Sequence, residues 1–178
     1  LFACNNLKLK AIQMSSSLHQ INISYIPEQD RLLLRASTSE QNEYRIWLTR
    51  RFSALILKIL DKQINNAGGM HKIASEQETL SQLKQGVFDK NYQEDTARKF
   101  PLGEDGVLGY QINSCTNQKG KLKIQLLPQQ GEGLNLALND SLLYLLHTLL
   151  EQAILQADWS LGTPSSQIRV PQGFKVEL

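Results

Sequence analysis

Arginine is concentrated in one short stretch of this chain. Five of the seven arginines lie between positions 31 and 51, with a tryptophan among them: Arg31, Arg35, Arg45, Trp47, Arg50 and Arg51. Guanidinium groups pair with phosphates and stack on bases, and an indole ring is a stacking platform worth about 1–3 kcal/mol per base. These residue types together suit single-stranded nucleic acid or another polyanion.

Acidic residues interleave with these arginines and favour a second interpretation. From position 28 to 51 there are five arginines against four acids, a net charge of +1; the acids are Glu28, Asp30, Glu40 and Glu43. The arginines could therefore pair with carboxylates of the adjoining turns, and Trp47 could be buried under another element or a partner subunit. Arg50 and Arg51 would begin a helix, where the macrodipole disfavours cations unless an anion or a carboxylate lies nearby.

Residues for catalysis or metal binding are not grouped into any motif that we recognise. The three histidines, His19, His71 and His147, lie far apart, and the two cysteines, Cys4 and Cys115, have no metal-site or disulfide spacing. Phosphate-binding loops, nucleophile elbows and zinc-protease motifs are absent from the sequence. We expect His147 to have a structural role inside a helix, and we predict no enzymatic activity, no cofactor and no metal.

Length and composition indicate one globular domain. The 178 residues are 41% hydrophobic and 20% charged, with a formal net charge of +2. No apolar run approaches the roughly 18 residues that span a bilayer, so we expect no membrane segment and a cytoplasmic protein. The opening Leu1-Phe2-Ala3-Cys4 is similar to a bacterial lipobox, although a signal segment does not precede it in this sequence, and Met14 is a credible alternative start.

Hydrophobic periodicity predicts three strands and a helix in the first half of the chain. Apolar residues alternate over 21–25, 32–36 and 44–48, as half-buried strands require. The period then changes to that of an amphipathic helix, with Thr49 as its N-cap and Gly68-Gly69 at its end. The predicted stripe of this helix is Phe52, Leu55, Ile56, Ile59, Leu60 and Ile64.

The same order of elements recurs later in the chain, and from Leu32 to Ile64 the pattern repeats at an offset of 90 residues without a gap. Strands are predicted over 108–112, 122–126 and 134–138, followed by a helix that Asn139 caps. Few of the superposed residues are identical, so this is a repeat of pattern rather than a demonstrated duplication, and two generic units with similar loop lengths are the alternative. Either way, the sequence predicts an α+β fold of two βββα halves, antiparallel meanders each closed by an amphipathic helix.

The rest of the chain is divided as follows. We expect an N-terminal extension at 1–17, one domain at 18–161 with halves 18–69 and 100–161, and a C-terminal tail at 162–178. The connector, 70–99, carries a thin apolar stripe that predicts an intervening helix, and its members are Ile73, Leu80, Leu83 and Val87.

Strand alternation also predicts which side chains share a face. If Leu32, Leu34 and Ala36 point into the core, Arg31 and Arg35 point away from it, and the same holds for Arg45 and Trp47 on the next strand. The second half offers cationic Lys121 and Lys123 at corresponding places. The candidate binding residues are therefore Arg31, Arg35, Arg45, Trp47, Arg50, Arg51, Lys121 and Lys123.

Two stretches carry a family resemblance: Tyr25 to Arg35, and Glu43 to Arg51 with its Trp47-Leu48-Thr49-Arg50-Arg51 junction. With them, the region from Leu18 to Leu161 resembles a family of uncharacterised, mostly proteobacterial proteins, which implies no activity. The strand-rich halves closed by helices also resemble, in architecture, the Whirly and Pur-type single-stranded nucleic-acid binders, which often form oligomers and have four strands per unit.

We therefore expect a non-enzymatic module that binds single-stranded nucleic acid or another polyanion through an arginine and tryptophan sheet face. The alternative is a protein-interaction domain that forms a homodimer or higher oligomer through the same face.

Overall fold

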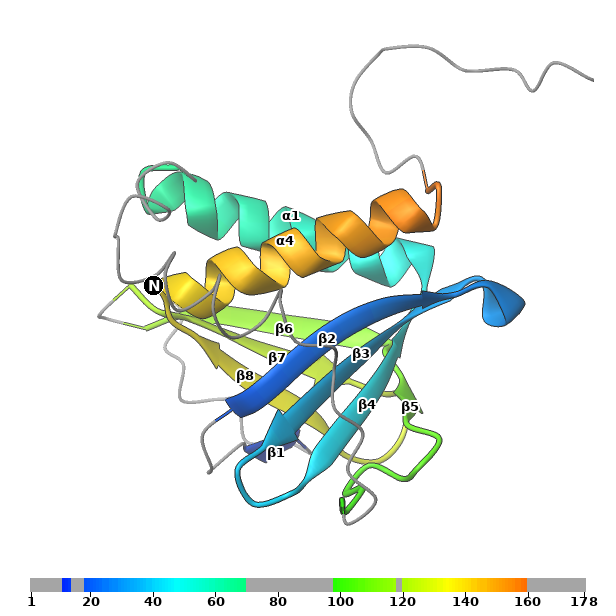
Figure 1. Cartoon of the computed structure of the whole chain (residues 1–178). Coiled ribbons are helices and arrows are strands. Elements are labelled where there is room, and N and C mark those ends of the chain that lie inside the picture. Colours follow the sequence, from blue (N-terminus) through cyan, green and yellow to red (C-terminus); the bar gives the residue numbers. More distant parts are fainter. Residues whose placement is uncertain (1–10, 14–17, 70–97, 118–119, 160–178) are drawn as a thin grey trace, which may run out of the picture.

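The computed structural model describes residues 11–13, 18–69, 98–117 and 120–159, which form two four-stranded sheets and two helices (Figure 1). The first half contributes β2 (Leu18–Ile26), β3 (Arg31–Thr38), β4 (Glu43–Leu48) and α1 (Arg50–Asn66). The second contributes β6 (Gln111–Thr116), β7 (Leu122–Leu127), β8 (Gly133–Leu138) and α4 (Asp140–Gln156). The predicted α+β class, with two antiparallel meanders each followed by a helix, is confirmed. The intervening helix predicted from Ile73 to Val87 lies outside the described residues, as does the tail.

The two halves share geometry as well as pattern. At the 90-residue offset, β4 begins and ends at the positions equivalent to those of β8, and α1 begins and ends at the positions equivalent to those of α4. The predicted caps are confirmed: the Thr49 hydroxyl accepts from the Phe52 amide at 3.2 Å, and the Asn139 side chain accepts from the Leu142 amide at 2.8 Å. Pairing registers agree too, since β3 pairs with β4 as β7 pairs with β8.

Each sheet gains a fourth, parallel strand that the sequence did not predict. Strand β1 (Ala11–Gln13) precedes the first half but pairs with β8 of the second half. Strand β5 (Val107–Leu108) precedes β6 of the second half but pairs with β4 of the first half. The halves thus exchange short strands reciprocally, and β1 places part of the expected N-terminal extension in a sheet. Neither half completes its own sheet.

The chain changes sheets at Gly109. The Gly109 amide donates to the Trp47 carbonyl at 2.9 Å, and the Tyr110 amide donates to Leu127 of the other sheet at 2.8 Å. A Cβ at Gly109 would lie 2.5 Å from Cε1 of Phe52, so a side chain does not fit here. Leu108 and Tyr110, predicted to alternate into the core, are instead 41% and 66% exposed, because no single strand runs through this junction.

Helices α1 and α4 lie side by side and run in opposite directions along one side of the sheets (Figure 1). Helix α4 contacts β2 and α1 contacts β6, so each helix packs on the leading strand of the other half. The stripe predicted for α1 is wrong at Leu55, which is 41% exposed, because the helix turns Ser53 inward instead. Neither described helix has the length and apolar content of a bilayer-spanning segment.

Candidate binding surface on the first sheet

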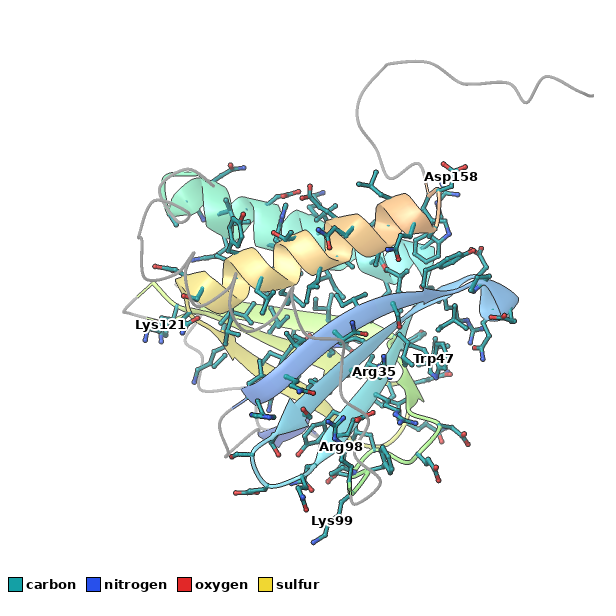
Figure 2. The ribbon with its side chains drawn as sticks, viewed as in Figure 1. Arg35, Trp47, Arg98, Lys99, Lys121 and Asp158 are labelled. Atoms are coloured by element: carbon teal, nitrogen blue, oxygen red, sulfur yellow. The ribbon has the colours of Figure 1, made fainter. Side chains whose placement is uncertain are left out.

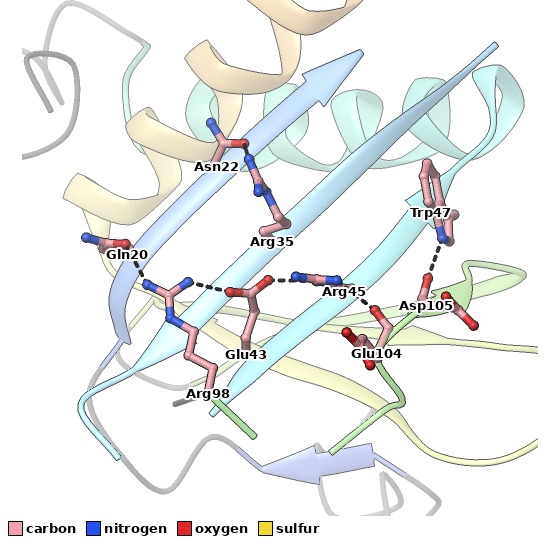
Figure 3. Close-up of polar contacts among 9 residues, drawn as sticks. All are labelled: Gln20, Asn22, Arg35, Glu43, Arg45, Trp47, Arg98, Glu104 and Asp105. Carbon is pink, nitrogen blue, oxygen red and sulfur yellow. Dashed lines mark hydrogen bonds and ion pairs between the residues drawn. The ribbon is translucent and has the colours of Figure 1, made fainter. Parts of the chain in front are cut away.

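The predicted strand orientation is confirmed by the alternation of burial. On β3 and β4 one set of side chains is at most 4% exposed: Leu32, Leu34, Ala36, Tyr44, Ile46 and Leu48. The intervening Arg31, Leu33, Arg35, Arg45 and Trp47 are half-buried on the opposite side. We call this opposite side of β2, β3 and β4 the Arg/Trp face. Figure 3 shows Arg35, Arg45 and Trp47 together on it.

Cross-strand pairing arranges the Arg/Trp face in two adjoining rows. Arg35 is paired with Asn22 on one side and with Arg45 on the other, and its Nη2 donates to Asn22 Oδ1 at 3.2 Å. In the next row Leu33 lies beside Trp47. A cationic row therefore runs next to an apolar row that lies two residues away along each strand, and within each row the side chains are directly opposed across the ladder.

Glu43 is an acidic residue on the same face and is 1% exposed. Arg45 Nε donates to its Oε1 at 2.7 Å, and Arg98 Nη1 donates to its Oε2. Arg98 Nη2 reaches on to Gln20 Oε1 of β2 at 3.3 Å (Figure 3). The expectation of turn carboxylates pairing with arginines therefore fits Glu43. Its burial was not predicted, because the second cation comes from a distant segment.

That segment, residues 98–108, runs along β4 and is called the edge segment below. The amide of Glu43 donates to the Lys99 carbonyl at 2.8 Å, and β5 closes the segment beside Ile46 and Trp47. Between these anchors the chain folds onto the Arg/Trp face, where Phe100 places its ring centroid 4.5 Å from Cζ of Arg45.

Two backbone carbonyls of the edge segment hold the central side chains. Arg45 Nη1 donates to the Glu104 carbonyl at 2.8 Å, and Trp47 Nε1 donates to the Asp105 carbonyl at 2.7 Å (Figure 3). Gly106 permits this approach, because its φ is +75° and a Cβ there would lie 2.6 Å from Cβ of Arg45. Both carboxylate-bearing residues of this turn, Glu104 and Asp105, are exposed.

The eight predicted binding residues do not form one surface. Arg31, Arg35, Arg45 and Trp47 share the Arg/Trp face, and Arg50 and Arg51 are exposed at the start of α1. Lys121 and Lys123 are exposed on the second sheet, and Figure 2 shows Lys121 at the opposite side of the molecule from Trp47. The sequence interpretation missed Arg98 and Phe100, because no local pattern links them to β4.

The second sheet is an internal comparison for the first. At the 90-residue offset Arg35 and Arg45 superpose on Gln125 and Asn135, and Leu33 and Trp47 superpose on Lys123 and Ala137. There the amide of Asn113 donates to Gln125 Oε1 at 2.9 Å, so a neutral amide row replaces the arginine row. The two halves share a scaffold and differ in the chemistry of their outer faces.

Outside the Arg/Trp face, one titratable cluster joins the helices. His147 is 5% exposed, and its Nε2 lies 2.8 Å from Asp61 of α1 while its Nδ1 lies 3.3 Å from Glu151. Glu151 is four residues after His147 on the same helix, a signal that the sequence interpretation overlooked. In the described part of the chain no group of His, Cys, Asp and Glu side chains has the arrangement of a metal site.

The chain matches no family model, no curated protein and no solved structure. The resemblances to an uncharacterised family and to the Whirly and Pur-type architecture therefore stay predictions.

Proposed function

We propose that this protein is a non-enzymatic binding module that holds single-stranded nucleic acid, or another polyanion, on the Arg/Trp face. One observation carries the proposal: the face has four arginines against one carboxylate, a net charge of +3, beside a half-buried tryptophan; the charged residues are Arg31, Arg35, Arg45, Arg98 and Glu43. Arginine clusters with an indole supply both phosphate pairing and base stacking.

The contacts described above suggest different roles for the central residues. Arg45 already donates to Glu43 and to the Glu104 carbonyl, so we assign it a positioning role with a positive charge directed at the ligand. The ring of Trp47, which is half-buried on this face, is the group that we assign to base stacking. The Glu43 contact holds the Arg45 side chain in place before binding, and a side chain held in advance loses less conformational entropy on binding, which favours affinity.

The contrast with the second sheet supports assigning function to the first. Both sheets have the same strand order and the same register in their central pair, so folding alone explains neither the arginines nor the tryptophan. The equivalent positions Gln125, Asn135 and Ala137 show that this scaffold accepts neutral and small residues there. The strand scaffold itself therefore does not require a charged row, as expected of a binding surface.

Binding of a fluorescein-labelled oligothymidylate of about 12 nucleotides, followed by fluorescence polarisation at low and moderate salt, tests the proposal. We expect salt-sensitive binding, because neutralised phosphates release counterions. Arg31→Ala and Trp47→Ala should each weaken it about tenfold, and Lys123→Ala on the second sheet should have little effect. Inorganic polyphosphate as competitor separates the two ligand classes, since Trp47→Ala should weaken only the base-bearing ligand. The proposal would be refuted if neither the wild-type protein nor a variant without the Glu104 and Asp105 charges bound at low salt.

A second function, subunit assembly through the same face, is favoured by one feature. Leu108, 41% exposed, continues the apolar row of Leu33 and Trp47 at the β5 edge, and Tyr110, 66% exposed, follows it two residues later in the chain. Aromatic residues and arginine are enriched at protein interfaces. Light scattering of the wild-type protein and of the Trp47→Ala and Tyr110→Ser variants tests this function. A dimer that either change dissociates supports it, and a wild-type monomer argues against it.

A further inference from the structure

We infer that the 100–106 turn of the edge segment is an internal competitor for the Arg/Trp face, which a bound polyanion displaces from Arg45 and Trp47. This inference concerns the regulation of the site proposed above and rests on that proposal. On this inference, the structure described above is the closed form of the Arg/Trp face, in which the turn occupies the binding contacts.

The contacts of the turn imitate those of a nucleotide strand. The Glu104 carbonyl accepts from a guanidinium N–H of Arg45 at 2.8 Å, where a phosphate oxygen would accept. The Phe100 ring lies on that guanidinium, 4.5 Å from its Cζ, where a base would stack. The Asp105 carbonyl takes the single indole donor of Trp47 at 2.7 Å. The chain thus fills with its own groups three contacts that an incoming ligand needs.

The turn also brings negative charge to the rim of the face. With Glu104 and Asp105 included, the local net charge falls from +3 to +1, because both exposed side chains belong to the residues whose carbonyls touch Arg45 and Trp47. Like charges at a rim reduce the rate and strength of association with a polyanion. Backbone carbonyls that merely buttress Arg45 and Trp47 do not require acidic side chains.

The turn has the anchoring that a displaceable segment needs. On one side the Lys99 backbone is paired with residues 41 and 43, and Arg98 is held by buried Glu43. On the other side β5 is paired with Ile46 and Trp47. Between them the turn bonds to itself, from the Gly103 amide to Phe100 and from the Gly106 amide to Gly103. Glycines 103 and 106, at φ +91° and +75°, flank the two acidic residues and give the backbone freedom to re-orient.

Indole N–H resonances of ¹⁵N-labelled protein report displacement directly, because the chain has two tryptophans. Trp159, whose Nε1 donates to Asp30 at 2.9 Å, is the internal reference. With saturating inorganic polyphosphate, which has no bases to stack on the ring, we expect the Trp47 indole signal to shift and the Trp159 signal to stay. The paired change Glu104→Gln with Asp105→Asn should tighten binding about threefold to tenfold at low salt, since exposed charges contribute modestly and are screened by salt. The matched control, Glu132→Gln with Asp158→Asn, removes two exposed carboxylates elsewhere and should change affinity less than twofold.

The outcomes separate this inference from the proposed function. Wild-type protein that binds polyphosphate with an unmoved Trp47 indole signal, or an unchanged oligothymidylate affinity of the Glu104→Gln/Asp105→Asn variant, overturns the inference and leaves the proposed function standing. Binding by the variant alone supports the inference, because the turn would then block the wild-type face. Absence of binding by both proteins overturns both claims. Circular dichroism of each variant confirms that these exposed changes leave the fold intact.

Discussion

Asp61 on α1 and Glu151 on α4 occupy equivalent positions of the two halves, 90 residues apart, and their carboxylates contact opposite nitrogens of the His147 ring. The residue equivalent to His147 on α1 is Leu57, which is half-buried. At this pair of equivalent positions α4 has an imidazole where α1 has a leucine, which places a polar link within a mostly apolar seam.

This link predicts different outcomes for two substitutions of His147. His147→Ala leaves a cavity and should lower the free energy of unfolding by about 2 kcal/mol. His147→Leu restores the apolar residue of the equivalent position, and Asp61 and Glu151 are about half exposed and stay solvated. It should therefore stay within about 1 kcal/mol of wild type. Urea unfolding followed by circular dichroism measures both, and equal losses would show that the carboxylate contacts dominate.

Removing the buried carboxylate of the Arg/Trp face should be costly. Glu43→Gln leaves Arg45 and Arg98 with an uncompensated charge, and the Arg98 side chain is 6% exposed. We expect a loss of about 3 kcal/mol in the free energy of unfolding. Glu104→Gln, an exposed carboxylate in the same region, is the control and should change it by less than about 0.5 kcal/mol. Thermal or urea unfolding gives the comparison, and similar values for the two variants would contradict this account of Glu43.

Alkaline pH should destabilise the protein through two tyrosines. Burial, with a smaller effect of the Glu40 charge, raises the pKa of Tyr44 above its ordinary 10.0. Desolvation, together with Asp30 and Glu28, raises the pKa of Tyr25 as well. Because the folded state then binds these protons more tightly than the unfolded state, stability is fully present below about pH 10 and falls as the pH rises further. Tyr44→Phe should make the free energy of unfolding fall less steeply between pH 9 and 11, as measured by urea unfolding. An unchanged dependence on pH would contradict the role of Tyr44.

The change of sheets at Gly109 should tolerate no side chain. Gly109→Ala places a methyl group against the Phe52 ring and should lower the free energy of unfolding by about 1–3 kcal/mol. Phe52→Leu frees space at that position, so the double variant should lose less than the sum of the two single losses. A double-mutant cycle by urea unfolding measures the coupling, and simple additivity would indicate that the clash is relieved elsewhere.

Local periodicity predicted much of this fold. The alternation from Leu32 to Leu48 fixed which side chains are buried, and the caps Thr49 and Asn139 marked where the helices begin. The alternation of apolar residues does not predict strands that are short and that pair with a distant part of the chain. Strands β1 and β5 have three and two residues, and each pairs with the half to which it does not belong, so no sequence window contains both partners.

The binding surface was predictable in part for the same reason. The positions of Arg35, Arg45 and Trp47 on one face follow from strand geometry alone. Their partners do not, because Arg98, Phe100 and the carbonyls of Glu104 and Asp105 approach from about 55 residues away in the sequence. The sequence alone indicates a solvated turn residue at Glu43, because the contact with Arg98 that accompanies its burial comes from a distant segment.

Photo-crosslinking with an oligonucleotide that carries 4-thiothymidine, followed by peptide mass spectrometry, tests the central claim most directly. The two sheets share their scaffold, so the second sheet is a control within the same molecule. The account predicts adducts on peptides that contain β3 and β4, lost in Trp47→Ala. Adducts on the Lys121 to Asn135 region instead, or spread evenly over both sheets, would contradict it.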